Sequence, residues 1–266
     1  MSERLAPAKV NLALVVGPTR PDGRHEVVTV LQRLALADTI RLEEADSLSV
    51  DGFAGDTLVR SAVRAVAGRA GVEPRWRATI EKRIPVAAGL GGGSSDAAAA
   101  LLLANESLAS PLAEGDLHAV ASKLGADVPF FLTTGPQLGE GDGTRLTPLD
   151  LPQDFWVLLA LPHGARKAST ASVYAAFDRI RGDEGFEQRR AELLRGLALG
   201  DIGSLPANDL ASSPLAERLV ELGAIRADVS GAGPTVYALF AEEADAVTAA
   251  ASLRGRADLW ITTPGW

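Results

Sequence analysis

The sequence contains no cysteine among its 266 residues. Disulfide bonds, thiolate zinc sites and cysteine nucleophiles are therefore excluded. Histidine is also scarce, and His25, His118 and His163 lie far apart without the spacing of metal ligands. The sequence consequently offers no residue that we would assign to a metal site.

The sequence also lacks a basic surplus and a long apolar run. Its net charge is −8, which argues against a general nucleic-acid binder, although a local group of cations could still hold a small anionic substrate. The N-terminal run MSERLAPAKVNLALVVG contains Lys9 and Asn11 and is too short and too polar for a signal peptide or a membrane span. We therefore expect a cytoplasmic protein that associates with neither nucleic acid nor membrane.

Two common nucleotide-binding patterns are absent. The chain has no Gly-Lys pair, which the P-loop pattern G-x-x-x-x-G-K-[ST] requires. The dinucleotide pattern G-x-G-x-x-G is met at Gly89 and Gly91 but fails at its third position, which is Ser94. The second glycine cluster, SGAGPT at 230–235, does not match it either. A phosphate site on this chain must therefore be of another kind.

The sequence does contain a glycine-rich segment that leads into an apolar helix. Residues 85–96 read PVAAGLGGGSSD and continue as AAAALLLANESL. Glycine permits positive φ and close approach of the backbone to a ligand, and a helix N-terminus adds unpaired N–H groups and a positive dipole end. The segment predicts a phosphate-binding loop, in which Ser94 and Ser95 could cap the helix or offer a hydroxyl to a phosphate or a metal ion. A flexible turn with an ordinary serine cap is the alternative.

Hydrophobic periodicity predicts a mixture of strands and helices in a globular protein that is 47% hydrophobic and 23% charged. We expect strands at 8–16, 27–36, 39–43, 75–82, 155–161, 227–229, 235–240 and 259–262, and helices at 56–70, 95–108, 114–124, 172–180, 187–199, 215–222 and 242–253. A further short helix is expected at 127–132 with Asp127 as its cap, and Gly125 should end the helix before it. Because the elements do not alternate strictly, the sequence indicates an α+β fold, with a boundary near 148–152 that separates domains 1–150 and 151–266.

Three segments together resemble the motifs of the GHMP small-molecule kinases. They read APAKVNLAL at 6–14, PVAAGLGGGSSDAA at 85–98 and DVSGAGPTVYAL at 228–239. The resemblance implies an N-terminal ATP-binding domain with a ribosomal-protein-S5-like arrangement, a ferredoxin-like C-terminal domain, and ATP with Mg²⁺ as the phosphoryl donor. The implied ATP-binding residues are Pro85, Val86, Ala87, Ala88, Gly89, Leu90, Gly91, Gly92, Gly93, Ser94 and Ser95.

Two further stretches are similar to one branch of that family. PDGRHEVVTVLQRLALADTI at 21–40 and LGADVPFFL at 124–132 resemble the branch that phosphorylates the 2-hydroxyl of a cytidyl diphosphate methylerythritol in non-mevalonate isoprenoid synthesis. A GHMP kinase for mevalonate-type alcohols, homoserine or a sugar is an alternative, and a non-catalytic nucleotide-binding regulator is another. We expect a monomer or a weak homodimer.

The resemblance implies two catalytic residues, Lys9 and Asp127. Asp127 would accept the proton of the substrate hydroxyl late in the reaction, because a carboxyl group with a pKa of about 3.9 cannot deprotonate an alcohol in advance. Lys9 would orient Asp127 and the hydroxyl and would stabilise developing charge. Without the resemblance, Asp127 could equally be a helix cap before Pro129, and Lys9 an exposed strand residue.

The implied substrate-binding residues are Asn11, Arg24, His25, Thr170 and Tyr174. Asn11 follows Lys9 by two positions on a strand, so both side chains share a face, and Asn11 would bind a substrate hydroxyl or satisfy nearby backbone. His25 would read the cytosine edge, Thr170 would contact the substrate from the C-terminal domain, and Tyr174 would stack on the base or fill a helix core.

Arg24 departs from the family pattern, because it stands where a tyrosine is usual. A guanidinium plane can stack on an aromatic ring, so Arg24 could replace the tyrosine, or it could be a solvated charge. We expect weaker or altered cytidine discrimination rather than loss of the reaction.

Overall fold

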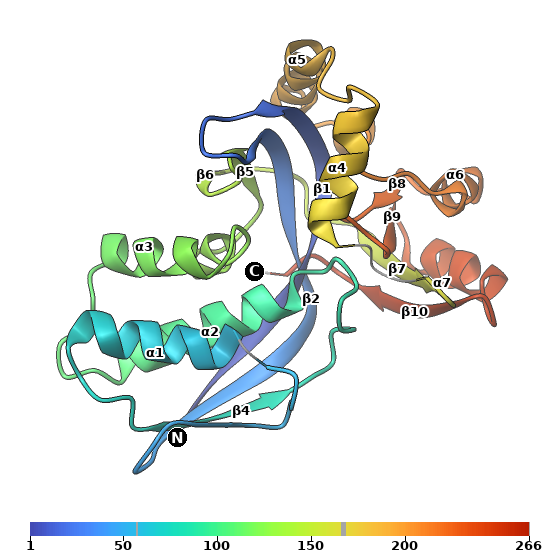
Figure 1. Ribbon diagram of the computed structural model, residues 1–266. Coiled ribbons are helices and arrows are strands. Elements are labelled where there is room, and N and C mark those ends of the chain that lie inside the picture. Colours follow the sequence, from blue (N-terminus) through green and yellow to red (C-terminus); the bar gives the residue numbers. More distant parts are fainter. Residues whose placement is uncertain (57, 166–168, 266) are drawn as a thin grey trace. The chain divides into compact units, whose positions relative to one another are not determined.

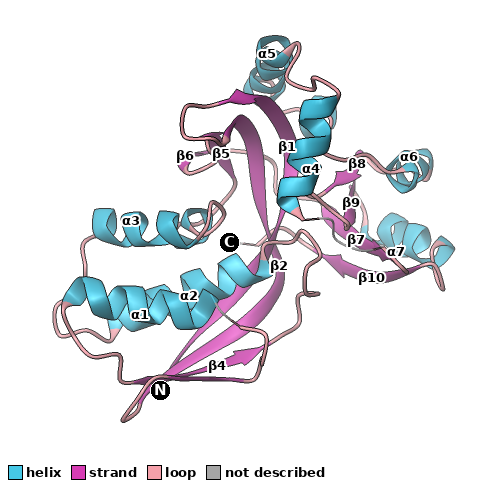
Figure 2. Cartoon of the chain, in the orientation of Figure 1, coloured by secondary structure: helices cyan, strands magenta, loops and turns pink. Residues whose placement is uncertain are grey.

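The computed structural model describes residues 1–56, 58–165 and 169–265. Helices and strands are mixed along these ranges (Figure 2), and the expected α+β class is confirmed. The chain divides into two compact units that alternate along the sequence. The first unit comprises residues 1–8, 36–86 and 91–134, and the second comprises residues 9–35, 87–90 and the described residues from 135 onward.

Two long strands contribute residues to both units. Strand β1 (Ser2–Thr19) pairs with β2 (His25–Glu44). Every residue from Ala8 to Val16 is buried, so both faces of β1 are covered in this stretch. The sequence predicts two separate strands across 27–43, whereas the structure has one continuous strand there.

In the first unit, helices cover a small sheet. The second half of β2 pairs antiparallel with β4 (Trp76–Glu81), which pairs in parallel with β3 (Ser49–Asp51). Helix α1 (Leu58–Ala70) buries Val59, Ala62, Val63 and Val66, a spacing that forms one helical face, and lies beside α2 (Gly92–Glu106) (Figure 1). Helix α2 is buried at every position from Ser95 to Leu101, as expected for a helix that is apolar all round.

One of two predicted helix caps in this unit is confirmed. Helix α3 (Glu114–Leu124) ends at Gly125, which is its C-cap residue as predicted, with an extended backbone at φ 168°. The segment after it is the 3₁₀ helix η1 (Pro129–Leu132), whose N-cap residue is Val128. The predicted capping role of Asp127 is therefore wrong, because a 3₁₀ turn starts one residue later than the expected helix.

The second unit contains an antiparallel four-stranded sheet in the order β10-β7-β9-β8. Its strands are β7 (Trp156–Pro162), β8 (Arg226–Val229), β9 (Val236–Phe240) and β10 (Ala257–Thr262). Helices α6 (Pro214–Glu221) and α7 (Glu243–Ser252) contribute Leu219 and Ala246 to the same core as Leu158 and Phe240. All six of these elements are close to their predicted positions.

The rest of the second unit surrounds the first half of β2. That half pairs with β5 (Gln137–Gly141), which pairs with β6 (Arg145–Pro148); the sequence analysis predicts neither strand. Helices α4 (Thr170–Arg179) and α5 (Phe186–Ala198) and the 3₁₀ helix η2 (Ile202–Ser204) complete it. The boundary proposed near residue 150 stays a prediction. No helix within the described ranges has the length and apolar character needed to cross a bilayer.

Candidate active site

Strand β1 carries a buried lysine and asparagine that contact each other. Lys9 is 4% exposed and Asn11 is 5% exposed, and the Lys9 Nζ donates a hydrogen bond of 2.6 Å to the Asn11 Oδ1. The Asn11 amide in turn donates to the Thr29 hydroxyl at 2.8 Å, and that hydroxyl donates to the carbonyl of Ala13. The burial excludes the exposed-lysine interpretation, and the chain of hydrogen bonds fixes the position of the ammonium group.

The second glycine cluster lies against this pair. Gly231 has φ +58°, and a Cβ at this position would be 3.2 Å from the Asn11 Oδ1 and 3.6 Å from the Lys9 Nζ. The Asn208 amide donates to the carbonyls of Val229 and Gly231. A side chain at residue 231 would therefore press on Asn11 and Lys9, and glycine lets the backbone of SGAGPT lie beside this pair.

A buried tyrosine anchors β1 beside Asn11. Tyr237 on β9 is fully buried, donates to the carbonyl of Leu12 at 3.0 Å and accepts a hydrogen bond from the Arg226 Nε at 2.9 Å. Burial raises the pKa of Tyr237 to about 12, so the phenol keeps the proton that it donates. This contact joins β9 to the stretch of β1 that carries the two polar side chains.

The glycine-rich segment has a backbone in which positive φ recurs at every second residue. Ala87 has φ 57°, Gly89 has φ 82° and Gly91 has φ 70°. Left-handed residues of this kind occur in the backbone nests whose successive N–H groups bind anions. Ala87 is the unexpected member, because an alanine in the left-handed region costs about 1–2 kcal/mol, and strain of this kind is typical of functional loops.

Residues 88–90 are held by hydrogen bonds within the second unit. The Thr235 N–H donates to the Ala88 carbonyl at 3.2 Å, the Ser230 hydroxyl donates to the Gly89 carbonyl at 3.0 Å, and the Lys9 N–H donates to the Leu90 carbonyl at 2.9 Å. Three consecutive carbonyls are thus occupied, and the backbone of the loop next to Lys9 is fixed.

The loop ends at the N-terminus of α2. The N-cap residue is Gly91 and no side chain caps the helix, so the expectation that Ser94 or Ser95 caps it is wrong; both serines lie inside the helix, which begins three residues earlier than predicted. The N–H groups of the first turn have no partner within a helix, and the positive end of the dipole favours an anion there. The buried Ser95 hydroxyl has no hydrogen-bond partner among the described residues.

Two of the predicted substrate residues lie together in the second unit. The rings of His25 and Tyr174 stack with centroids 4.9 Å apart, and the edge of Phe177 meets His25 at 5.9 Å. A centroid distance of 4.9 Å is direct ring contact, so no base fits between His25 and Tyr174 in this arrangement. Tyr174 also packs against the small core formed by residues that include Leu14 and Phe177, as the core interpretation expects.

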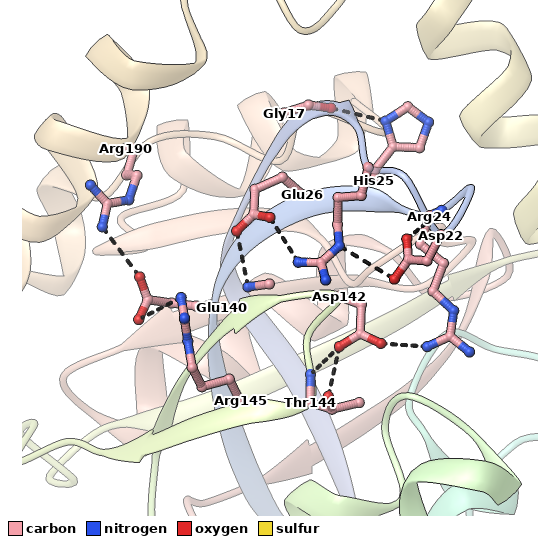
Figure 3. Close-up of polar contacts among 12 residues, drawn as sticks. Gly17, Asp22, Arg24, His25, Glu26, Glu140, Asp142, Thr144, Arg145 and Arg190 are labelled. Carbon is pink, nitrogen blue, oxygen red and sulfur yellow. Dashed lines mark hydrogen bonds and ion pairs between the residues drawn. The ribbon is translucent and has the colours of Figure 1, made fainter.

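The His25 ring is oriented by a backbone carbonyl (Figure 3). The Nδ1 lies 2.9 Å from the carbonyl oxygen of Gly17, and because a carbonyl only accepts, Nδ1 carries the hydrogen. The Nε2 then points the other way and lies 3.3 Å from the Asp178 Oδ1. The orientation of the ring is thus fixed through Nδ1, and Nε2 is its second polar atom.

The side chain of Arg24 does not join His25 and Tyr174 but forms an ion pair with Asp142. Figure 3 shows its guanidinium directed away from the His25 ring and bonded to Asp142, which also accepts from the Thr144 N–H and hydroxyl. Burial acts to raise the pKa of Asp142, but the hydrogen bonds from Thr144 and Arg24 outweigh it and lower the pKa. The proposed stacking of Arg24 on cytosine stays a prediction, and it requires this ion pair to open.

The same close-up shows a network of polar contacts around His25, in which a hydrogen bond to Glu26 joins that segment to strand β5. Glu26 accepts from the Gly141 N–H at 3.2 Å and from the Arg20 guanidinium at 2.9 Å, and Glu140 is paired with Arg190 and Arg145 (Figure 3). This network could not be predicted from the sequence, since its members are spread over 170 positions. It fixes the backbone that presents His25.

Two further predicted site residues, Asp127 and Thr170, take no part in the contacts described above. Asp127 belongs to the first unit, between α3 and η1, and is partly buried. Thr170 is the exposed first residue of α4. The roles assigned to both by resemblance stay predictions. The sequence analysis also misses a buried cluster in the first unit, Asp38, Lys82 and Asp96, whose only local signal is an aspartate within an alanine-rich helix.

Comparison with known proteins matches the chain to two family models. The description "GHMP kinases N terminal domain" matches residues 57–135, and "GHMP kinases C terminal" matches residues 204–258. A 4-diphosphocytidyl-2-C-methyl-D-erythritol kinase of Nocardia farcinica is 40% identical, covering 93% of this chain and 87% of that protein. The enzyme of the same name from Geobacter metallireducens is 37% identical, with 96% and 95% covered.

Solved structures of the same family also match this chain. A crystal structure of 4-(cytidine 5'-diphospho)-2C-methyl-D-erythritol kinase superposes with a TM-score of 0.83 at 36% identity, and all of both chains is covered. A homoserine kinase from Cytophaga hutchinsonii superposes with a TM-score of 0.74 at 18% identity, over 98% of this chain and 94% of that one. The second likeness concerns the fold alone.

Proposed function

The chain belongs to the GHMP kinase family, within its 4-diphosphocytidyl-2-C-methyl-D-erythritol kinases, and we propose on this premise that it transfers the γ-phosphoryl group of ATP to the 2-hydroxyl of that cytidyl substrate. The reaction is a step of non-mevalonate isoprenoid synthesis. The observation that carries the phosphoryl-transfer assignment is the loop at 85–95, where positive φ at 87, 89 and 91 precedes an uncapped helix N-terminus. The identity of the acceptor rests on relatives that match almost the entire chain.

The loop fits the triphosphate of ATP on structural grounds. The uncapped first turn of α2 supplies N–H donors, and the buried Ser95 hydroxyl is available to a ligand because it has no partner among the described residues. We propose that Mg²⁺ accompanies ATP, where it would neutralise charge on the phosphate oxygens. We assign no protein ligand to it, and Ser94 and Ser95 are the loop residues with a hydroxyl to offer.

Lys9 and Asp127 are the proposed catalytic residues. Phosphoryl transfer needs alignment, charge neutralisation and an acceptor for the hydroxyl proton. Asp127 would take the proton as the new bond to phosphorus forms, since its carboxylate is too weak a base to act earlier. Lys9, held by Asn11, would stabilise the charge that develops on the attacking oxygen, and Asn11 would bind the substrate hydroxyl.

The cytidine pocket would be built around His25 and Tyr174. With its tautomer fixed by Gly17, His25 presents Nε2 to the polar edge of the base, and Tyr174 would stack on the base once the direct His25–Tyr174 contact opens. Thr170, at the start of the same helix as Tyr174, would contact the substrate nearby. Arg24 would either leave Asp142 and stack on the base, or stay with Asp142 so that one face of cytosine has no stacking partner.

Substitution of Arg24 by tyrosine tests this pocket. We expect Arg24→Tyr to increase the preference for the cytidyl substrate over its uridyl analogue, because a second stacking surface would hold the base with its polar edge toward His25. The stacking itself contributes about 1–3 kcal/mol for either base. The measurement is kcat/KM for the two analogues with each protein. The matched control is Arg24→Ala, which also removes the ion pair with Asp142 but adds no ring. Equal discrimination in the parent and Arg24→Tyr would reject the role of position 24.

The function itself is tested by ADP release. The purified protein should release ADP with the cytidyl substrate but not with mevalonate or homoserine, the substrates of other GHMP kinases. Turnover of one of those instead would favour another branch of the family, and no turnover with any of them would favour a nucleotide-binding regulator. We further propose a cytoplasmic enzyme, monomeric or weakly dimeric, that binds neither nucleic acid nor membrane; size-exclusion chromatography tests the oligomeric state.

A further inference from the structure

The two ends of the glycine-rich loop meet in the first unit. Ile84 precedes the loop and Gly92 follows it, and a Cβ built on Gly92 would be 3.1 Å from the Ile84 Cγ2 and 3.4 Å from the Lys82 Nζ. Such distances mean that Gly92 packs directly against the chain that enters the loop. The chain therefore leaves the first unit before residues 87–90 and re-enters it after them at one place, which we call the loop neck.

An ionic cluster lies at the loop neck. The Lys82 ammonium donates to the Asp38 Oδ2 at 2.5 Å and to the Asp96 Oδ2 at 2.7 Å. The side chains of Asp38 and Asp96 are 0% and 4% exposed, and that of Lys82 is 17% exposed. One ammonium thus joins a strand, β2, to the phosphate-binding helix, α2.

Asp38 also holds the backbone that enters the loop. Its Oδ1 accepts from the N–H of Arg83 at 2.5 Å and from the N–H of Ile84 at 2.8 Å. The residues on the entry side are consequently fixed by Asp38, and the exit side is fixed by Asp96 on the second turn of α2. Lys82 is the link between the two sides.

The cluster is not an obvious source of stability. Two carboxylates share one ammonium, and the Asp96 Oδ1 is buried without a hydrogen-bond partner among the described residues. Burial is the main cause that raises the pKa of Asp96 to about 7, against the opposing effect of Lys82. Buried ion pairs are often no more stabilising than apolar groups of the same shape, so the arrangement calls for a role other than packing.

We propose that Lys82, Asp38 and Asp96 are positioning residues that set the geometry of the phosphate-binding loop by tying its two ends together. The inference rests on the proposed function in one respect, that the loop binds ATP. The positive-φ residues at 87, 89 and 91 determine how the N–H groups alternate, whereas the loop neck determines where the first turn of α2 lies relative to the chain entering the loop. A loop already held in one geometry binds its ligand more tightly, because less ordering is left to the binding step.

Substitutions at Asp96 test the link between α2 and Lys82 and leave the Lys82–Asp38 pair in place. Asp96→Ala removes the link from α2 and should raise the KM and the dissociation constant for ATP on the order of tenfold, with kcat and the KM for the cytidyl substrate changed by less than about threefold. Asp96→Asn is the matched control, because its amide oxygen still accepts from Lys82, and it should restore ATP binding to near the parent value. Hydrogen exchange of the amides at 85–93 should quicken in Asp96→Ala alone.

The outcomes separate this inference from the proposed function. ATP binding is measured by calorimetry without the second substrate, so a parent protein inactive toward the cytidyl substrate rejects the function and leaves the loop-neck test intact. Parent-like ATP affinity in a folded Asp96→Ala protein would overturn the inference. If Asp96→Ala does not fold, Asp96→Leu, which fills the same volume, takes its place. Failure of both to fold would show that the cluster is needed for folding and would reject the positioning role.

Discussion

Replacement of Asp127 by asparagine should lower kcat by roughly 10²–10⁴-fold while ATP binding stays within about threefold of the parent value. Asparagine has nearly the same shape and keeps an oxygen acceptor, but it cannot take a proton at neutral pH. Catalysis by a positioned base typically contributes a factor of this size. We expect kcat to fall while ATP binding is kept, because the proton is transferred only during the chemical step.

The structure removes the competing explanation for Asp127. The N-cap residue of the following helix is Val128, so the substitution removes no helix cap. Asparagine also keeps the shape and one oxygen acceptor of aspartate, and we therefore expect the unfolding midpoint of Asp127→Asn to remain near that of the parent. Asp46→Asn is a suitable control, since Asp46 is exposed and the chemical change is identical.

The decisive measurement combines single-turnover kinetics with ATP-binding calorimetry on both variants. Loss of turnover in Asp127→Asn with intact ATP binding supports its assignment as the general base. Parent-like turnover in that variant would remove Asp127 from the mechanism. An equal loss in Asp46→Asn would point instead to a general effect of charge.

The parts of the site that could be predicted from the sequence are those encoded locally. Lys9 and Asn11 are two positions apart on a strand, so their shared face follows from strand geometry, and their hydrogen bond confirms it. The glycine loop could be predicted for the same reason, because loop and helix are consecutive in the chain. The start of α2 at Gly91 rather than at a serine was not predictable, since glycine and serine are both acceptable N-cap residues.

The parts that could not be predicted depend on partners distant in sequence. Lys82 meets Asp38 and Asp96, which lie 44 and 14 positions away, and no local pattern distinguishes them from solvated charges. Arg24 meets Asp142 across 118 positions, so sequence alone left its side chain open to either interpretation. Strands β5 (QLGEG) and β6 (RLTP) are short and hold few residues that favour strands. The pairing of β5 with β2, and of β6 with β5, therefore comes from tertiary structure rather than propensity.

Gly89 is the glycine of the loop whose replacement should have the largest structural effect. It has φ +82°, and a Cβ at this position would be 2.7 Å from the carbonyl oxygens of both Gly233 and Ser230. Those oxygens belong to backbone that also binds the loop, since the Ser230 hydroxyl donates to the Gly89 carbonyl. Neither oxygen can therefore move aside without opening the contact between the two glycine clusters.

We expect Gly89→Ala to lower the free energy of unfolding by roughly 2–5 kcal/mol, from about 1–2 kcal/mol for alanine in the left-handed region and about 1–3 kcal/mol for overpacking. Any folded protein should also bind ATP at least about a hundredfold more weakly, because relief of the clash displaces the loop backbone. Gly68→Ala is the matched control: Gly68 lies inside α1 with no atom within 4 Å of an added Cβ, so the same substitution should raise stability by about 0.5–1 kcal/mol. Urea denaturation and ATP calorimetry on the two variants measure both effects. A Gly89→Ala protein as stable as the parent, with parent-like ATP affinity, would show that the loop backbone is free to shift and that its close packing against SGAGPT is not what shapes the phosphate site.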